Sequence, residues 1–219
     1  MRIVIAGGHG QIALRLATLL AARGDEVVGL VRNPAHVDDV GAAGATAAVV
    51  DLEEADAASL AEHLEGADAV VFAAGAGPGS GVARKDTVDR AAASLLADAA
   101  ARAGVRRYLL VSAIGIDDEP DAGRGEQWVA YVHAKKAAED AVRATDLDWT
   151  FLRPGRLTDD AGVGTVRLGP PGLPYGEITR DDTAAVLVAL LDTPASAGLV
   201  LDAVGGATPI GDAVAAAVR

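Results

Sequence analysis

The sequence predicts an α/β fold in which helices cover both faces of a parallel sheet. Short, nearly continuous apolar runs alternate with longer segments rich in Ala and Leu along the chain of 219 residues. Strands that are buried on both faces have such continuous runs, whereas half-exposed strands alternate apolar and polar residues. The composition agrees, because 51% of the residues are hydrophobic and only 3% are aromatic. The core must therefore consist mainly of Ala, Val, Leu and Ile, which suits thin, closely packed layers.

Strands and helices alternate from one end of the chain to the other in this interpretation. The strands are expected at residues 3–6, 26–31, 46–50, 69–73, 107–112, 149–152 and 199–202. The helices are expected at residues 11–23, 57–64, 82–103, 127–145, 179–191 and 209–218. This alternation predicts a doubly wound Rossmann domain, with strand order 3-2-1-4-5-6-7 and helices on both faces of the sheet.

The chain is expected to form a single domain that spans residues 1–219. Too few residues follow the sixth expected strand to build a separate substrate domain. Within residues 154–219, the Gly- and Pro-rich segment from Pro154 to Gly176 is expected to form a loop over the edge of the active site. We therefore expect one nucleotide-binding domain with a small substrate-side loop region.

Charge and composition exclude several classes of function. The formal net charge is −12, which argues against binding to nucleic acid or to an anionic membrane. The chain has no Cys, and its four His show no HxxxH spacing, so we expect no disulfide, no thiol nucleophile and no metal site. No segment reaches the ~18 apolar residues that span a bilayer, and the first apolar run is too short for a signal peptide. We expect a cytoplasmic monomer or homodimer that acts on a small molecule.

A glycine-rich loop lies between the first expected strand and the first expected helix. It comprises Gly7, Gly8, His9, Gly10, Gln11, Ile12 and Ala13. Gly7 allows a tight turn, Gly10 lets a pyrophosphate approach the backbone, and Ala13 keeps the helix close to the sheet. The run fits G-x-x-G-x-x-A from Gly7 and G-x-G-x-x-A from Gly8, with His9 contributing its backbone rather than its imidazole. We predict that the loop holds the phosphates of a dinucleotide; the alternative is a glycine turn without a ligand.

The residues that end the second expected strand favour NADP(H) over NAD(H). NAD-binding domains usually have Asp or Glu there, bonded to the ribose 2′-hydroxyl. Here the strand ends in Leu30-Val31-Arg32-Asn33-Pro34, and the planar guanidinium of Arg32 suits a 2′-phosphate. The alternative is that Arg32 is a solvated surface residue. Asp51 and Leu52, after the third expected strand, are placed to contact the adenine; the alternative for Asp51 is a helix N-cap.

A candidate catalytic set lies near the end of the fifth expected strand. Tyr131 and Lys135 stand four residues apart on an expected helix and therefore share one face. Because a neighbouring ammonium favours a phenolate, we expect Lys135 to lower the pKa of Tyr131. Tyr131 would exchange a proton with a substrate oxygen, Lys135 would also bind the nicotinamide ribose, and Ser112 would hold the substrate carbonyl. The alternative for Tyr131 is a ring that lines a core or a binding cleft.

These residues resemble the short-chain dehydrogenase/reductase superfamily over nearly the whole chain. The chain looks like the atypical branch of NAD(P)-binding proteins called epimerase-like or NmrA-like, which includes small flavin and biliverdin reductases. The motifs that carry the resemblance are Gly7-x-x-Gly10-x-x-Ala13, Ala73-Ala74-Gly75, Ala103-Gly104-Val105-Arg106-Arg107, Ser112, Tyr131-x-x-x-Lys135 and Arg153-Pro154-Gly155. The resemblance implies that the segment Ala73, Ala74 and Gly75 passes close to the adenine ribose. It also implies that the backbone of Pro154, Gly155 and Leu157 borders the nicotinamide.

Two positions depart from the pattern of the superfamily. Many relatives have Ser-Ser at the end of the fifth strand, whereas Ala113 takes the second place here. The usual Asn of the long middle helix is replaced by Asp89, which is able to hold a water or brace Lys135 and therefore joins the candidate catalytic set.

Three functional hypotheses follow. The first is an NADP(H)-dependent oxidoreductase that acts on a small carbonyl, hydroxyl, flavin or quinone compound, and the intact Tyr131 and Lys135 favour it. The second is a non-catalytic NADP(H)-binding redox sensor of NmrA-like type, which Ala113, Asp89 and the short C-terminal part favour. The third is an NAD-dependent sugar epimerase or dehydratase, which needs a larger sugar pocket than this C-terminal part is expected to build.

Overall fold

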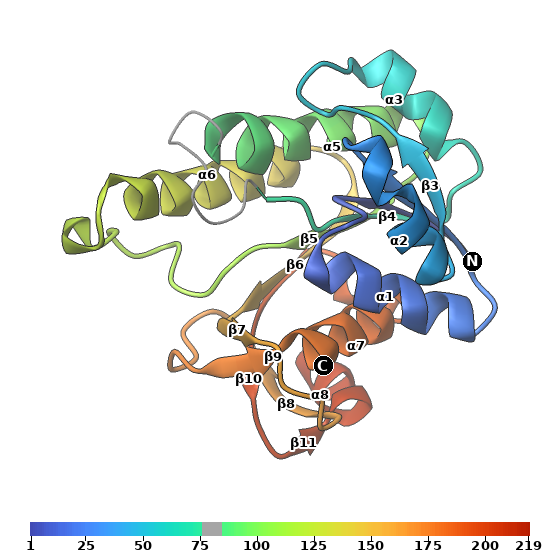
Figure 1. The fold of residues 1–219 in the computed structure, drawn as a ribbon. Helices are drawn as coiled ribbons and strands as arrows, with labels where there is room; N and C mark the ends of the chain where they lie inside the picture. The colour runs from blue at the N-terminus through green and yellow to red at the C-terminus, as the bar shows by residue number, and fades with distance from the viewer. Residues whose placement is uncertain (76–84) are drawn as a thin grey trace.

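The computed structural model describes residues 1–75 and 85–219, and its central feature is a mainly parallel sheet between two layers of helices (Figure 1). The strands of this sheet are β1 (Arg2–Ala6), β2 (Glu26–Val31), β3 (Thr46–Val49), β4 (Ala69–Phe72), β5 (Arg107–Val111), β6 (Asp148–Pro154), β8 (Thr165–Gly169), β10 (Leu199–Gly205) and β11 (Thr208–Pro209). A separate small pair consists of β7 (Arg156–Thr158) and β9 (Glu177–Thr179). The α-helices are α1 (Gln11–Ala22), α2 (Val37–Ala42), α3 (Ala57–Leu64), α5 (Ala92–Ala103), α6 (Glu126–Arg143), α7 (Arg180–Leu191) and α8 (Ile210–Ala217). The shorter helices are η1 (Pro34–His36), η2 (Lys85–Ala91), η3 (Ala122–Arg124) and η4 (Pro194–Ser196), of which η2 is a π-helix.

The strand order of the sheet is β11-β8-β10-β6-β5-β4-β1-β2-β3. All pairs from β3 to β10 are parallel, which confirms the predicted order 3-2-1-4-5-6-7. The chain leaves β1 towards β2 and later returns to β4 on the other side of β1. In sheets of this kind, ligands bind at the carboxyl ends of the strands where the order reverses, so the carboxyl ends of β1 and β4 mark the expected site.

Beyond β10 the sheet departs from the prediction. β8 pairs antiparallel with β10, and β11 pairs antiparallel with β8. The expectation of a loop from Pro154 to Gly176 is therefore wrong, because this segment contains β7 and β8. Glycine and proline on both sides conceal β8 in the sequence. Its strand conformation depends on backbone pairing with β10, which lies about thirty residues further along the chain, and local propensity does not report such pairing.

Successive residues of the central strands face opposite sides of the sheet. Ile3 and Ile5 of β1 pack into one core with α1, α7 and α8, whereas Val4 and Ala6 pack into a second core with α3, α5 and α6. Figure 1 shows these two groups of helices on opposite sides of the sheet. The residues that α5 buries are mostly alanines, as the low aromatic content predicts.

The sequence pattern does not indicate the two short helices after β2. The side chain of Asn33 accepts a hydrogen bond from Ala35 N (3.0 Å) and so begins η1. α2 follows and buries only Val40, so it has no periodic apolar face to detect. The long helix expected at residues 82–103 is η2 followed by α5 from residue 85, and residues 82–84 lie outside the described residues. In the part of the chain that the structure describes, none of the helices combines the length and apolarity needed to cross a bilayer.

A close backbone contact holds the glycine loop against β2. Gly8 N donates a hydrogen bond to Leu30 O (2.9 Å). A Cβ on Gly8 would lie only 2.6 Å from the Cα of Gly29. No side-chain rearrangement relieves this contact, because the backbone fixes the positions of both atoms. Glycine at this position therefore determines how near the loop lies to the sheet.

We expect Gly8→Ala to lower the free energy of unfolding by about 1–3 kcal/mol, because the added methyl group forces the loop away from β2. Urea denaturation measures this change. The control is Gly41→Ala on the exposed side of α2, where a Cβ meets no atom within 4 Å. That variant should gain about 0.5–1 kcal/mol, because glycine disfavours a helix. Equal stability of the Gly8 variant and the wild type would contradict the contact.

Candidate functional site

The glycine loop turns sharply between β1 and α1. Gly7 has φ +81°, in the left-handed region, and Gly10 N donates to Gly7 O (2.7 Å), which closes the turn. Gly10 is the N-cap residue of α1, and none of the described side chains caps this helix end. The first N–H groups of α1 are therefore available to an anionic ligand at the positive end of the helix dipole.

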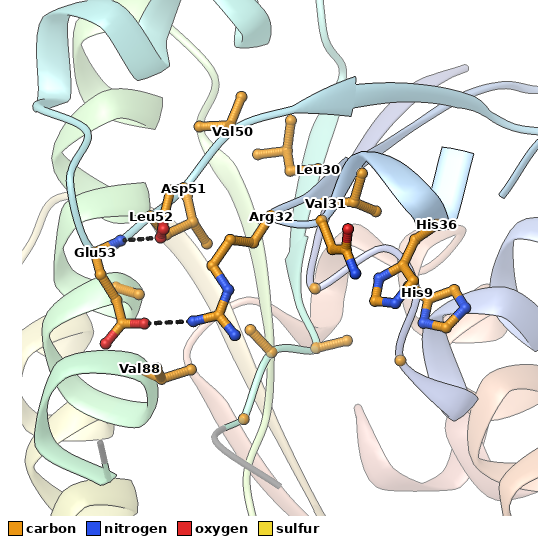
Figure 2. A pocket seen from close by; sticks show the side chains of 17 residues that line it. His9, Leu30, Val31, Arg32, His36, Val50, Asp51, Leu52, Glu53 and Val88 are labelled. Atoms are coloured by element: carbon orange, nitrogen blue, oxygen red, sulfur yellow. Dashed lines mark hydrogen bonds and ion pairs between the residues drawn. The ribbon is translucent and has the colours of Figure 1, made fainter. Parts of the chain in front are cut away.

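A cavity of about 380 Å³ opens beside this loop, where the carboxyl ends of β2, β3 and β4 meet it (Figure 2). This volume lies within the range of roughly 300–1,000 Å³ that is usual for small-molecule sites. The structure brings many of the predicted cofactor-binding residues together in its wall, namely Gly7, His9, Gly10, Arg32, Asp51, Leu52, Ala73, Ala74 and Gly75. The cavity is thus the best candidate for a nucleotide site.

Three residues of the predicted loop set do not line the cavity. Gly8 packs on β2, Ile12 belongs to the hydrophobic core, and the side chain of Gln11 accepts a hydrogen bond from Arg15 (2.8 Å). Gln11 and Ile12 can offer a ligand their backbone N–H groups, and Gln11 also an exposed side chain, whereas the N–H of Gly8 is already bonded to Leu30 O. Their role in binding stays a prediction.

Arg32 lies across the cavity rather than extending freely into solvent. Its Nη1 donates to Oε2 of Glu53 (2.8 Å), and the other carboxylate oxygen of Glu53 accepts from Thr87 Oγ1 (2.6 Å). Figure 2 shows Arg32 and Glu53 pointing towards each other. The guanidinium is half exposed, so it remains within reach of a ligand while Glu53 keeps its direction. Sequence reasoning missed Glu53, because nothing in the sequence shows that the turn after β3 faces the end of β2.

Asp51 stabilises the turn after β3. Its Oδ1 accepts from Glu53 N (3.0 Å), whereas Asp56 caps α3 by accepting from Ala58 N and Ser59 N. The alternative that Asp51 is a helix N-cap is therefore wrong, because the cap lies five residues later. Asp51 and Leu52 both line the cavity, so their contact with adenine stays a prediction that the geometry allows.

His9 and His36 form the wall of the cavity on the side of the glycine loop. Their rings stack with centroids 3.6 Å apart and an interplanar angle of 11°. Nε2 of His9 lies 2.8 Å from Oδ2 of Asp39 in α2. Figure 2 shows the two imidazoles side by side, away from Arg32 and Glu53. The imidazole of His9 lines the cavity together with that of His36, which η1 places against it, and the greater importance of the His9 backbone stays a prediction.

The predicted catalytic residues Lys135, Asp89 and Ser112 lie close together at the carboxyl end of β5. Lys135 is 5% exposed, and its Nζ donates to Val111 O (3.0 Å) and lies 3.5 Å from Asp89 Oδ1. Asp89 lies beside Gly75 of the cavity wall, because a Cβ on Gly75 would lie 3.2 Å from its Oδ1. The hydroxyl of Ser112 is buried and makes no hydrogen bond to any described residue. A polar cluster therefore connects the nucleotide cavity with the end of β5.

Tyr131 lies on α6 beside this cluster, but its pKa is shifted in the unexpected direction. Burial raises the pKa of Tyr131 above its ordinary value, and Asp89 and Tyr175 raise it further. The expectation that this pKa is lowered beside Lys135 is wrong, because the burial of the phenol dominates and disfavours the charged phenolate. The phenol is therefore held in its protonated form, which can donate a proton but resists losing one to solvent.

The residues expected to border the nicotinamide lie outside the wall of the cavity. Pro154 ends β6, and its carbonyl accepts from Ile114 N (3.2 Å), while Gly155 N donates to Ala203 O (2.9 Å). Leu157 lies on β7 and is paired in register with Ile178 of β9. This places them at the carboxyl ends of β6 and β10, on the side of the site where Ser112 lies.

Buried charges fix the loops on this substrate side. Arg153 of β6 forms two hydrogen bonds with Glu139 of α6 (2.8 and 2.6 Å) and two with Asp117 in the loop after β5 (2.5 and 3.2 Å), and it holds the pKa of Asp117 below its ordinary value. Asp202 of β10 accepts from the N–H groups of Gly172 and Leu173 (2.8 and 3.2 Å), and burial raises its pKa. The loop that Asp202 holds, which follows β8, leads directly to Tyr175.

The aromatic side chains of this region gather near α6. The rings of Trp128 and Tyr131 have centroids 5.6 Å apart, and the guanidinium of Arg124 lies 3.4 Å from the centroid of Trp128. The side chain of Tyr175 is 62% exposed. Trp128 is therefore held between Arg124 and Tyr131 and is not part of the hydrophobic core.

Comparison with known proteins agrees with this geometry. The sequence profile of a family described as NAD(P)H-binding matches residues 7–194, a range that contains the whole wall of the cavity. The chain belongs to this NAD(P)H-binding family. Its resemblance to atypical short-chain dehydrogenases/reductases is confirmed at this level, and so is the Rossmann fold.

Members of the NAD(P)H-binding family and solved structures resemble the chain over almost its full length. A protein of Bacillus subtilis (strain 168), named uncharacterized sugar epimerase YhfK, is 33% identical over 98% of this chain and 99% of the relative. A Bacillus halodurans protein, described provisionally as an NAD-dependent epimerase/dehydratase, superposes with a TM-score of 0.90 at 32% identity, over 99% of both chains. The oxidoreductase ylbE from Lactococcus lactis superposes with a TM-score of 0.86 at 26% identity, over 99% of this chain and 96% of ylbE.

Enlarging Gly10 tests whether the phosphates of a dinucleotide bind at this loop. A Cβ on Gly10 would lie 3.0 Å from Gly7 O, so the larger Gly10→Val side chain should open the turn and crowd the start of α1. We expect this variant to lose NADPH binding in a fluorescence titration while it keeps its far-ultraviolet circular dichroism. The control is Gly211→Val on α8, where a Cβ meets no atom within 4 Å. Unchanged affinity of the Gly10 variant would show that the phosphates bind elsewhere.

Proposed function

We propose that this NAD(P)H-binding protein is an NADP(H)-dependent oxidoreductase that reduces a small carbonyl, flavin or quinone compound. The observation that carries the proposal is the hydroxyl of Ser112, which is 3% exposed and has no hydrogen-bond partner among the described residues. Leaving a buried hydroxyl without a partner costs about 1–3 kcal/mol. A protein retains such a group where a ligand supplies the partner, and the carboxyl end of β5 is the place for a substrate in this fold.

The residues present fit a dinucleotide. The uncapped N–H groups of α1 suit a pyrophosphate, and the apolar side chains of Leu30, Val50 and Leu52 provide a wall for an adenine ring. When it is bound, the nicotinamide supplies hydride exchange with the substrate. The protein itself must orient the substrate, exclude water and provide a proton.

Arg32 supports the choice of NADP(H). It is directed across the cavity by Glu53, and its planar guanidinium offers parallel donors to a phosphate. The chain has no acidic residue at the end of β2 to bind a ribose 2′-hydroxyl, since Asp25 and Glu26 lie at the other end of the strand. A 2′-phosphate must share Arg32 with Glu53 or displace Glu53 from it. This competition sets how much more strongly the site binds NADPH than NADH.

Ser112 and Tyr131 provide the polar chemistry of the reaction. The hydroxyl of Ser112 can donate to a substrate oxygen, and the phenol of Tyr131 can transfer a proton to that oxygen as negative charge develops on it. Lys135 cannot turn freely, because Val111 O and Asp89 hold its ammonium. Burial raises the pKa of Tyr131, so its phenol is protonated in the resting site and is present as a proton donor for a reduction.

The raised pKa of Tyr131 weighs against a sugar epimerase. The names of two relatives refer to an epimerase. Epimerisation through a ketone must begin with removal of a hydroxyl proton, which needs a phenolate or another base. Burial and Asp89 both oppose the phenolate of Tyr131.

A non-catalytic NADP(H) sensor is the second candidate function. Ala113 in place of a second Ser and the compensation of Lys135 by Asp89 favour it, because both reduce the catalytic equipment while leaving the nucleotide cavity intact. The sensor hypothesis predicts cofactor binding without oxidation of NADPH by any aldehyde, quinone or flavin. Oxidation of NADPH by one member of such a panel would exclude it.

The cofactor proposal predicts that Arg32→Ala weakens NADPH binding and leaves NADH binding nearly unchanged. Loss of a charge-assisted contact should cost about 1.5–3 kcal/mol, since only NADPH carries the 2′-phosphate. Fluorescence titration of both cofactors measures the two affinities. The matched control is Arg167→Ala on β8, an exposed arginine outside the cavity. Equal affinities of the wild type for NADPH and NADH would overturn the preference.

The catalytic proposal predicts that Tyr131→Phe keeps its NADPH affinity and lowers turnover by about 10²–10⁴-fold, the usual contribution of a positioned general acid. Because the raised pKa keeps the phenol protonated as the pH rises, wild-type turnover should not lose this proton donor between about pH 7 and 9.5. Oxidation of NADPH against the substrate panel measures both effects.

The control is Tyr108→Phe, which removes a phenol hydroxyl from the core, where it donates to Ala93 O (3.0 Å). That variant should lose stability but keep its turnover. Reduction that proceeds at the same rate in Tyr131→Phe would show that the substrate takes its proton from water instead.

A further inference from the structure

The stacked imidazoles of His9 and His36 form a polar wall that the proposed function does not use. His9 is oriented by two contacts, the stack with His36 at 3.6 Å and the hydrogen bond to Asp39 at 2.8 Å. Because a carboxylate only accepts, Nε2 of His9 carries the hydrogen in this bond. The bond therefore assigns a hydrogen to Nε2 and fixes the orientation of the His9 ring.

His36 is the member of the pair that remains available to a ligand. It lines the cavity, and its ring nitrogens make no hydrogen bond to any described residue. It lies in η1, four residues after Arg32, and Figure 2 shows both side chains on the wall of one cavity. A ring that is fixed by stacking and lines the same cavity as Arg32 is suited to bind an anion in that cavity.

We propose that His36 is a ligand of the adenosine 2′-phosphate and that binding of this phosphate is coupled to the uptake of a proton by the stacked pair of imidazoles. This proposal rests on the proposed use of NADP(H). It assigns to His36, together with Arg32, the discrimination between a 2′-phosphate and a 2′-hydroxyl.

The coupling follows from the arrangement of charge. Two protonated imidazoles stacked at 3.6 Å repel each other, so the stack opposes a positive charge on both rings at once. A phosphate at the edge of His36 offsets that repulsion and stabilises a second proton. The other charged groups in the wall are Arg32, Asp51 and Glu53, and Glu53 already pairs with Arg32. A second positive charge at His36 would thus meet a phosphate that Arg32 alone neutralises incompletely.

The sign of the pH dependence follows by linkage. If binding takes up a proton, affinity increases as the pH falls through the range of about pH 8 to 6 in which histidine gains its charge. The phosphate itself loses charge near about pH 6, which opposes the trend at the acid end. The informative quantity is therefore the ratio of affinities between the wild type and a variant that cannot gain the proton.

The experiment uses adenosine 2′,5′-bisphosphate and adenosine 5′-monophosphate as probes, because they differ only in the 2′-phosphate. Isothermal titration calorimetry of the intact chain gives the affinity at pH 6.5, 7.5 and 8.5, and two buffers of different ionisation enthalpy give the protons taken up. The variant is His36→Gln, which keeps a hydrogen-bonding side chain without the charge. The control is His133→Gln, an exposed histidine on α6.

We expect wild type and His133→Gln to take up a proton with the bisphosphate and not with the monophosphate. His36→Gln should bind the bisphosphate roughly tenfold more weakly at pH 6.5, as expected for loss of a charge-assisted contact, with a smaller deficit at pH 8.5. Its affinity for the monophosphate should not change.

Each other result has a distinct meaning. Equal weakening of both probes would place His36 at the pyrophosphate and overturn the assignment. A bisphosphate preference that His36→Gln leaves intact, or binding without proton uptake, would overturn the role of His36 while the use of NADP(H) stands. Equal wild-type affinity for the two probes would overturn the NADP(H) proposal itself. Proton uptake by the wild type needs no variant, so a misfolded variant leaves the test intact.

Discussion

The close approach of the glycine loop to β2 is the constraint on which the rest of the site depends. Gly8 lies against Gly29 with no room for a Cβ on Gly8, and this contact fixes the loop between the carboxyl ends of β1 and β2. The uncapped start of α1 then faces the cavity, with Arg32 on one side and the histidine stack on the other. A larger residue at Gly8 would displace the loop, and with it His9 and the start of α1, from the end of β2 that precedes Arg32.

Carboxylates lie beside the two cations of the site and beside the histidine stack. Glu53 holds Arg32, Asp89 lies beside Lys135, and Asp39 bonds His9. This arrangement is consistent with the net charge of −12, since a strongly acidic protein must orient its few positive groups to attract an anion. Binding of a phosphate then redistributes contacts that already exist. The strength of binding becomes a competition between ligand phosphates and protein carboxylates.

The substrate side is built differently from the cofactor side. Its loops are fixed by buried charges, with Arg153 linking β6 to α6 and to the loop after β5, and Asp202 holding the loop that leads to Tyr175. Breaking one partner of a buried pair leaves an uncompensated charge and is strongly destabilising. These charges therefore determine where Ser112 and Tyr131 lie relative to the end of β5.

The sequence by itself determined the elements and their order. Continuous apolar runs identified the parallel strands, and the spacing of Gly7, Gly10 and Ala13 located the nucleotide loop, because both patterns reflect constraints that act within a short segment. Only the tertiary structure decided which distant residues meet: β8 with β10, His9 with His36, Arg32 with Glu53, and Lys135 with Asp89. The direction of the Tyr131 pKa shift was decided there too, because the fold buries the phenol and places Asp89 and Tyr175 near it. Local patterns record which groups are present, whereas pairing across the fold sets their charge and their partners.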